Sequence, residues 1–468
     1  MNTSTPTQDT KSPVFPRDLI ARYDTAGPRY TSYPTAVQFH AGFTAQKLHE
    51  IIAATNAAPA PPPLSIYVHL PFCRTLCYFC ALNVVHTKDQ SLAEHYVDTV
   101  VREMDLVVPS LKPGREVVQL HWGGGTPTFA PPRALERLAR ATRDRFAIAR
   151  DVEMGVEIDP REMSDEHFEV LRAAGFNRLS MGVQDFDPEV QVAVHRLQSE
   201  EVTRWAIESG RKHGFASVNV DLIYGLPHQT TVNFKRTLER IVEMNPDRVA
   251  LFNLAYLPEL ARHQRAIKPE TLPAPDEKLA ILELAVSKLT EAGYVFIGMD
   301  HFARPEDPLT RALEAGTLYR NFQGYTTSAG ADLYAFGVSA VSSVGPSFSQ
   351  NDKDLAAYTS RVEAGELPVL RGVELTPEDH LRRAVILALM CHFVVVKRDF
   401  EAPYGVAFDS HFADALATLA PMAADGVVKL AADRIEVTPR GRFLVRNVAM
   451  AFDAYLADAQ GARFSRTV

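Results

Sequence analysis

Short apolar runs alternate with helical patterns from Leu64 onward, and this alternation limits the fold more than any other feature of the sequence. Each run has the length of a β-strand, and each is followed by a segment with the spacing of an amphipathic helix. Because we read these runs as apolar on both faces, we expect a parallel sheet covered by helices. Six such units predict the α/β class and a partial (βα)6, TIM-like barrel, with its chemistry at the carboxyl ends of the strands. The runs are Leu64–Leu70, Val117–Trp122, Met154–Ile158, Arg178–Val183, Val218–Tyr224 and Arg248–Leu254, and the helical segments lie near 91–107, 133–146, 164–174, 199–213 and 231–244.

Three of the four cysteines lie on the loop directly after the first predicted strand. Cys73, Cys77 and Cys80 have the spacing Cys-x3-Cys-x2-Cys. Three thiolates on one short loop can bind three corners of a cubane [4Fe-4S] cluster. The fourth iron then has no protein ligand and is open to a substrate or cofactor, whereas a cluster used only for electron transfer would normally have a fourth cysteine.

Two other interpretations of these cysteines are weaker. A structural zinc site needs four ligands, and His69 and His86 lie within reach, but a three-residue first gap is uncommon in zinc motifs. A disulfide cannot pair three cysteines on one tight loop. The fourth cysteine, Cys391, lies on an apolar helical pattern and is expected to be a buried core thiol.

Polar residues and glycines also follow the other predicted strands. Gly123–Gly125 would let the backbone approach a ligand closely, although a tight turn alone would also use such a run. Asp221 lies in an apolar strand, where an unpartnered carboxylate is costly, so it faces a ligand or a partner such as Arg196. The candidate residues at strand ends are Gly124, Gly125 and Thr126, then Glu157, Gln184, Arg196, Asp221 and Ala255.

The segments outside the six units predict the domain organisation. Gly27–Ala36 is rich in Tyr, Thr and Pro and reads either as a surface strap or as a substrate lid, with Arg29 facing an anion. Residues 300–345 have few helical features and read as capping loops or a substrate surface, with Arg304 or Arg320 facing carboxylates. We expect a disordered tail at 1–11, a strap with a linker at 12–63, the barrel with its capping loops at 64–345 and a mostly helical C-terminal domain at 370–468.

The C-terminal pattern resembles a winged helix. Thr376 and Pro377 predict a helix start, and further helices flank a short hairpin near 426–438. The net charge is −8 and these helices carry no basic stripe, so we expect no nucleic-acid partner. The sequence contains no apolar run of membrane-spanning length, and residues 1–11 lack the apolar core of a signal peptide. We therefore expect a cytoplasmic protein without a membrane partner.

The cysteine loop, with Phe79 before its last cysteine, resembles the signature of the radical S-adenosylmethionine (SAM) superfamily. Nearly the whole chain is similar to the oxygen-independent coproporphyrinogen III oxidase family, also called coproporphyrinogen dehydrogenases, of heme biosynthesis. The segments that carry this resemblance are Gly27–Ala36, His121–Thr128, Asn177–Phe186, Gly298–Pro305 and Arg320–Thr327.

The resemblance implies a radical SAM barrel that binds a [4Fe-4S] cluster and two SAM molecules. The implied reaction is oxidative decarboxylation of the ring A and ring B propionates of coproporphyrinogen III to vinyl groups, with an electron donor for the cluster and a further electron acceptor. A monomer is expected. The implied cluster ligands are Cys73, Cys77 and Cys80, the implied SAM residues are Tyr67, Phe79, Gly124, Gly125, Thr126, Glu157, Gln184, Arg196, Asp221, Ala255 and Val341, and the implied substrate residues are Arg29, Tyr30, Arg304, Arg320 and Gln323.

One position departs from the family pattern. The family usually has a further cysteine two residues after the third ligand, and Leu82 stands there in this chain. That cysteine is not expected to bind the cluster, so cluster and cofactor binding should survive, while any role of its thiol in electron or proton transfer would be missing. Related heme chaperones and heme-modifying radical methyltransferases also lack it, and they are the alternative functions. The segments Gly27–Ala36 and Arg320–Thr327 favour the oxidase.

Overall fold

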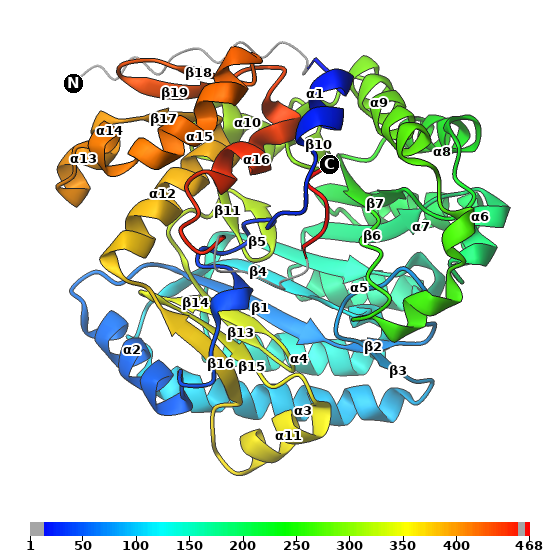
Figure 1. Ribbon diagram of the computed structural model, residues 1–468. Coiled ribbons are helices and arrows are strands. Elements are labelled where there is room, and N and C mark those ends of the chain that lie inside the picture. The colour runs from blue at the N-terminus through cyan, green and yellow to red at the C-terminus, as the bar shows by residue number, and fades with distance from the viewer. Residues whose placement is uncertain (1–13, 457–463) are drawn as a thin grey trace.

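The computed structural model describes residues 14–456 and 464–468, so the predicted disordered tail lies outside the described residues. Within these residues, the main sheet has twelve strands (Figure 1). Its middle consists of six parallel strands in chain order, so the predicted partial barrel is confirmed. These strands are β1 (Leu64–Leu70), β4 (Glu116–Gly124), β5 (Ala147–Ile158), β6 (Arg178–Gln184), β7 (Ser217–Tyr224) and β8 (Arg248–Asn253).

Helices connect successive parallel strands and cover the outer face of the sheet. Asp89 caps α3, because its side chain accepts a hydrogen bond from the Ser91 N–H. Thr230 and Asn233 form a capping box at the start of α8. The covering helices are α3 (Gln90–Val107), α4 (Pro132–Arg145), α5 (Asp165–Ala173), α7 (Glu200–Lys212), α8 (Thr231–Met244) and α9 (Pro275–Glu291).

The strands are not apolar on both faces, and this part of the prediction is wrong. In β5, Met154 and Val156 are buried in the core, while Glu153 and Glu157 line cavities on the inner face of the barrel. The other parallel strands alternate in the same way. The polar residues within each run therefore do not weaken the strand, because they face the lumen, where a ligand or water can satisfy them.

The two edges of the sheet contain strands beyond the six parallel ones. On one edge, β13 (Asp332–Phe336) pairs in parallel with β1 and is followed by three antiparallel strands. Part of the segment predicted as capping loops is therefore sheet, and it covers the open edge of β1. A buried ion pair between Arg115 and Asp332 (2.7 Å) fixes this edge. The remaining edge strands are β14 (Val341–Val344), β15 (Ser347–Asn351) and β16 (Val369–Glu374) on this side, and β10 (His301–Ala303) and β9 (Val295–Gly298) on the other.

The rest of residues 300–345 is also more regular than predicted. It contains α10 (Pro308–Glu314) and a hairpin of β11 (Tyr319–Asn321) and β12 (Gly324–Thr326). This hairpin lies against the open side of the barrel. Tyr325 of β12 reaches α12 (Pro377–His392), where its hydroxyl donates to the Met390 carbonyl oxygen (2.8 Å).

The N-terminal segment crosses the molecule beside the last residues of the chain. It contains α1 (Arg17–Tyr23) and α2 (Ala45–Ala57), and Figure 1 shows it in blue next to the red C-terminal segment. The two segments pair through a β-bridge between Ala26 and Arg466. Arg446 joins them further, since it donates to the carbonyl oxygens of Pro28 and Arg466 (both 2.9 Å).

The C-terminal region is mostly helical, as predicted. Thr376 caps α12 with Asp379 in a capping box, and Pro377 is its first residue. The other elements are β17 (Val394–Val396), α13 (Arg398–Tyr404), α14 (Phe408–His411), α15 (Ala413–Ala424), β18 (Val428–Leu430), β19 (Arg434–Val437) and α16 (Val445–Met450).

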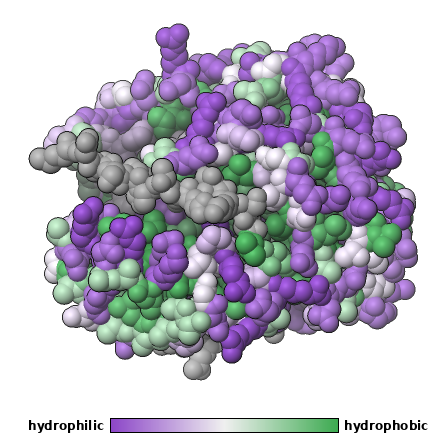
Figure 2. Space-filling model, turned by 90° about the horizontal axis from the view of Figure 1, so that it is seen from above, coloured by the Kyte–Doolittle hydropathy of each residue, from purple (hydrophilic) through white to green (hydrophobic). Residues whose placement is uncertain are grey.

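The surface is mainly polar on the face seen from above. In Figure 2 the hydrophobic residues there form separate patches among hydrophilic ones. Among the described helices, none combines the length and the apolar character needed to cross a bilayer.

Candidate active site

The loop after β1 carries the three clustered cysteines and forms one wall of a cavity at the carboxyl ends of the parallel strands. β2 (Phe72–Cys73) and β3 (Val85–His86) pair at the two ends of this loop. The cavity has a volume of about 160 Å³. The predicted site residues that line it are Cys73, Phe79, Cys77, Cys80, Gly124, Gly125, Thr126, Glu157, Gln184, Arg196 and Asp221.

The glycine turn after β4 packs directly against the cysteine loop. The Gly125 N–H donates to the Leu70 carbonyl oxygen (2.9 Å), and the Thr126 N–H donates to the Phe72 carbonyl oxygen (2.8 Å). A Cβ atom at Gly125 would lie 2.5 Å from the Pro71 carbonyl oxygen. This glycine is therefore needed for the contact between two backbones, and it sets where the cysteines stand relative to β4.

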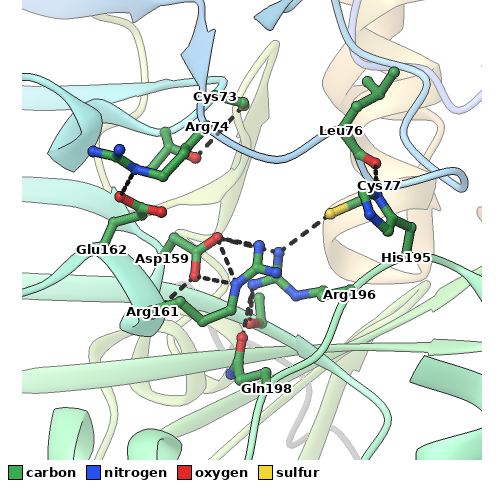
Figure 3. A network of polar contacts seen from close by, with 12 residues as sticks. Cys73, Arg74, Leu76, Cys77, Asp159, Arg161, Glu162, His195, Arg196 and Gln198 are labelled. Carbon is green, nitrogen blue, oxygen red and sulfur yellow. Dashed lines mark hydrogen bonds and ion pairs between the residues drawn. The ribbon is translucent and has the colours of Figure 1, made fainter. Parts of the chain in front are cut away.

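Two arginines and one aspartate lie beside Cys77 (Figure 3). Arg196 Nη1 lies 3.6 Å from Cys77 Sγ and 3.4 Å from Asp159 Oδ2. Arg161 Nη2 donates to the same carboxylate at 2.6 Å. Burial alone would raise the pKa of Asp159, but Arg196 and Arg161 lower it to about 2, so this carboxylate is ionised at neutral pH.

This arrangement corrects the predicted pairing of Arg196 with Asp221. Arg196 forms its ion pair with Asp159, and its Nη2 donates to the Gly182 carbonyl oxygen (2.6 Å). Asp221 Oδ1 instead accepts a hydrogen bond from Asn219 Nδ2 (2.7 Å). Spacing alone could not decide between the two carboxylates, because Asp159 follows β5 and Asp221 lies in β7, the two strands that flank β6.

The ionisation of Asp221 makes the stability of the protein depend on pH. Burial raises the pKa of its carboxyl group to about 7, although the hydrogen bond from Asn219 opposes this shift. In the unfolded chain the group ionises near pH ~4. Between about pH 4 and 7 the folded state therefore holds the proton that the unfolded state has released, and stability falls as the pH rises.

Asp221→Asn is expected to remove this dependence while keeping the oxygen that accepts from Asn219. The measurement is made without SAM. The melting temperature of the wild type minus that of the variant should fall from pH 5 to pH 7 and then stay level. An equal difference between the two proteins at pH 5 and pH 8 would contradict the assignment.

Glu157 belongs to the cavity wall, and two histidines lie near it. Glu157 Oε2 accepts a hydrogen bond from the Gly124 N–H (3.0 Å), and its Oε1 lies 3.6 Å from His121 Nε2. Tyr67 stacks on His121 at a centroid distance of 6.1 Å and also contacts His69 through its hydroxyl (3.2 Å). These contacts bring Tyr67 close to the cavity, although it is not among the residues that line it.

His69 is not free to serve as a fourth metal ligand. Its Nδ1 contacts the Tyr67 hydroxyl, and its Nε2 lies 3.1 Å from the Asn83 carbonyl oxygen. In the part of the chain that the structure describes, no three side chains of His, Cys, Asp or Glu converge on a single ion. A cubane cluster needs no such convergence, since each thiolate binds a different iron.

A second cavity of about 190 Å³ continues from the first into the barrel lumen. Glu157, Ser180 and Asp221 line both cavities, so the two adjoin. Several buried polar atoms around them have no hydrogen-bond partner within the described residues, and such atoms normally face a ligand or water. On the cavity walls these atoms are Gln184 Oε1, Arg196 Nε, Arg248 Nη2, His301 Nδ1 and Gln323 Nε2. Arg320 Nε and Nη1 also lack a partner within the described residues, and Arg320 lies behind the wall, against Tyr325.

Besides Tyr67, two further predicted SAM residues lie outside these walls. Ala255 is held near the cysteine loop, because Gln264 Nε2 donates to the carbonyl oxygens of both Ala255 (2.9 Å) and Phe79 (3.0 Å). Val341 begins β14 and packs in a small apolar cluster with Phe348. The structure thus brings Ala255 toward the loop and leaves Val341 in the neighbouring core.

The predicted substrate residues fall into two groups. The first contains Arg29, Tyr30, Arg320 and Gln323, and the second contains Arg304 alone. Arg29 pairs with Asp300, Gln323 lines the lumen cavity, and Arg320 stacks its guanidinium on Tyr325 (4.8 Å). Tyr30 is buried, and its hydroxyl donates to Asp453 (3.0 Å). These residues lie on the open side of the barrel or in the segments that cross it.

Arg304 does not belong to this site. It follows β10, which runs antiparallel to β8 and ends beside Arg248, the first residue of that strand. Arg304 therefore lies at the amino ends of the parallel strands, where it donates to the Ala292 carbonyl oxygen (2.8 Å). The sequence could not reveal this, because it depends on the direction of a three-residue strand.

Comparison with known proteins identifies the family. Residues 67–241 match the radical SAM superfamily, and residues 375–444 match the HemN C-terminal domain. The oxygen-independent coproporphyrinogen III oxidase of Pseudomonas aeruginosa is 47% identical over 96% of this chain and 98% of that protein. The chain belongs to the oxygen-independent coproporphyrinogen III oxidase family. The member from Synechocystis is 40% identical over the full length of both chains.

A solved structure of this family has the same fold. Coproporphyrinogen III oxidase (HemN) from Escherichia coli, described as a radical SAM enzyme, superposes with a TM-score of 0.91 at 45% identity. The match covers 95% of this chain and all of that one. As a radical SAM enzyme of the oxidase family, the chain uses a [4Fe-4S] cluster and SAM, and the three thiols that face one cavity beside Arg196 fit such a cluster.

Some residues of the cavity wall are not evident from the sequence. Arg161 and Ser180 line it, but neither stands out by type or spacing. Asp159 could have been found from the sequence, because it lies two residues after Glu157, just beyond the end of the third predicted strand. Leu82, which stands where the family pattern has a cysteine, lines the cavity with 60% of its surface exposed. Because the side chain is exposed, the leucine does not have to fit into a packed core.

Proposed function

We propose that this protein converts coproporphyrinogen III to protoporphyrinogen IX by oxidative decarboxylation of two propionate side chains. The observation that carries the proposal is the pair of adjoining cavities. The first lies at the three cysteines, and the second, which shares Glu157, Ser180 and Asp221 with it, lies in the lumen, where several polar groups have no partner within the described residues. One cavity can therefore hold the cofactors while the other holds a polar substrate next to them.

Cys73, Cys77 and Cys80 would hold the cluster, and the glycine turn, Glu157, Gln184 and Asp221 would hold SAM. When bound, this pair supplies a carbon radical that can take a hydrogen atom from the β-carbon of a propionate. The chain contributes position and shielding, because the barrel wall and the covering helices keep the reacting atoms away from water.

Arg320 and Arg29 are the proposed anchors for substrate carboxylates. Arg320 is only 3% exposed, and its Nε and Nη1 have no partner within the described residues. A buried guanidinium with unused N–H groups is costly unless a ligand accepts from it, and a carboxylate does so with two parallel bonds. Arg29 lies nearby and shares its charge with Asp300.

Arg320→Met is expected to raise the KM for coproporphyrinogen III by about 10- to 100-fold, the usual worth of a charge-assisted hydrogen bond. The affinity for SAM should change little, because Arg320 does not line the cysteine cavity. Arg304→Met is the matched control, since it removes an arginine at the opposite end of the strands. Equal effects of the two substitutions on KM would contradict the anchoring role.

The proposed activity is tested by an anaerobic assay with reconstituted protein, SAM, a reductant, an electron acceptor and coproporphyrinogen III. Loss of two CO2 per substrate is the expected result, and the porphyrin masses would show it. Methylated product, or tight heme binding without CO2 release, would overturn the proposal in favour of the methyltransferase or the chaperone.

The proposal also includes the partners of the reaction. An electron donor must reduce the cluster, and a further acceptor must take the electron that remains on the substrate after CO2 leaves. The proposal places the reaction in the cytoplasm and assigns it to a monomer, as expected from the sequence. Leu82 is compatible with this, since a cluster held by three thiols does not use that position.

A further inference from the structure

Asp159, Arg161 and Arg196 form a connected group of charged side chains beside Cys77. Asp159 accepts hydrogen bonds from Arg161 through both carboxylate oxygens, at 2.9 Å to Oδ1 and 2.6 Å to Oδ2. It also accepts from the Arg161 N–H (3.0 Å). The backbone turn after β5 and the carboxylate therefore hold the Arg161 guanidinium in one orientation.

Arg196 reaches the same carboxylate from the loop after α6 (Pro188–Ala193). Its Nη1 lies between Asp159 Oδ2 and Cys77 Sγ, while Nη2 is fixed by Gln198 Oε1 (3.0 Å). Arg161 lies close enough to Cys77 for the two side chains to interact electrostatically. Figure 3 shows the guanidinium groups of Arg161 and Arg196 gathered at the Asp159 carboxylate, with Arg196 extending toward the Cys77 sulfur.

The charges in this group do not cancel. Arg161 and Arg196 bring two positive charges and Asp159 one negative charge, and the side chains of Asp159 and Arg196 are less than one tenth exposed. A one-electron reduction adds negative charge to a cluster, so nearby cations and hydrogen bonds to its sulfur ligands favour the reduced form. A nearby carboxylate has the opposite effect.

We propose that Asp159 is a positioning residue that holds Arg161 and Arg196 against the Cys77 corner of the cluster, and that these three side chains together set the reduction potential of the cluster. The cations keep it reducible, and Asp159 prevents the potential from rising so far that the reduced cluster becomes a weak electron donor. This inference rests on the proposed function only in its use of the cluster, not in the identity of the substrate.

The test is a redox titration of the reconstituted protein without SAM and without substrate, followed by electron paramagnetic resonance. Asp159→Asn keeps an oxygen acceptor but removes the negative charge, so the midpoint potential should rise. Arg161→Gln removes a positive charge, so the potential should fall. Arg161→Lys keeps the charge and should stay near wild type, as should the remote control Asp105→Asn, which breaks an exposed pair with Arg145.

Shifts of the midpoint potential in opposite directions distinguish this role from a structural one. A general loosening of the site would shift the potential in the same direction whichever charge is removed. Unchanged potentials, or shifts in one direction for both variants at full iron and sulfide content, would overturn the proposal. If the Asp159→Asn protein holds no cluster, the comparison of Arg161→Gln with Arg161→Lys tests the proposal by itself. Equal midpoint potentials for these two variants would overturn the proposal. Failure of the proposed decarboxylation would instead leave these shifts intact and appear only in the product assay.

Discussion

Cys77→Ala is expected to abolish the absorbance of the iron–sulfur cluster and to reduce activity to background. The reason is that Cys77 is one of three thiols on the cavity wall, and no further cysteine lines the cavity among the described residues. Two thiolates cannot hold a cubane cluster firmly. The measurement is the iron and sulfide content after anaerobic reconstitution, together with the visible spectrum.

Cys391→Ala provides the matched control. Cys391 is buried on α12 at 1% exposure and packs in the hydrophobic core. Its replacement removes one sulfur atom from a packed site, which costs about 1 kcal/mol of stability and leaves the cluster intact. An intact, oxygen-sensitive cluster in the Cys77→Ala protein would contradict the ligand assignment.

Gly125→Ala is expected to displace the cysteine loop, with a marked loss of cluster content. The added Cβ would meet the Pro71 carbonyl oxygen at 2.5 Å and the Phe72 carbonyl oxygen at 2.8 Å, and neither backbone atom can turn away. Overpacking of this kind costs about 1–3 kcal/mol. Here the strain falls on the contact that positions the cluster ligands, so cluster retention should suffer more than the melting temperature.

Gly42→Ala is the control for this substitution. Gly42 is exposed, and a Cβ there would meet only the His40 ring at 3.0 Å, which can rotate away. Its melting temperature and iron content should stay close to wild type. Wild-type iron content in Gly125→Ala would show that the loop does not depend on the contact with β4.

The local parts of the architecture could be predicted from the sequence. The six parallel strands and the helices between them follow from short apolar runs and helical spacing, and the start of α12 follows from Thr376 and Pro377. The cysteine loop was equally visible, because its three ligands lie within eight residues. Such features depend on neighbours along the chain.

The rest depends on contacts between distant segments. The pairing of β13 with β1 joins residues more than 260 positions apart, as in Leu64 with Asp332. The pairing of Arg196 with Asp159 rather than Asp221 depends on where the loop after α6 places Arg196 in the folded chain. In the sequence, the polar residues inside the strands only interrupt apolar runs. In the structure, they lie together and form the inner wall of the site.

In the proposed reaction, the cavity holds a propionate β-carbon next to the radical source. The most direct test is an anaerobic turnover with coproporphyrinogen III deuterated at the β-carbons of its propionates, followed by mass analysis of the 5′-deoxyadenosine. Deuterium is expected to appear in 5′-deoxyadenosine in step with CO2 release. Unlabelled 5′-deoxyadenosine formed alongside decarboxylated product would contradict it.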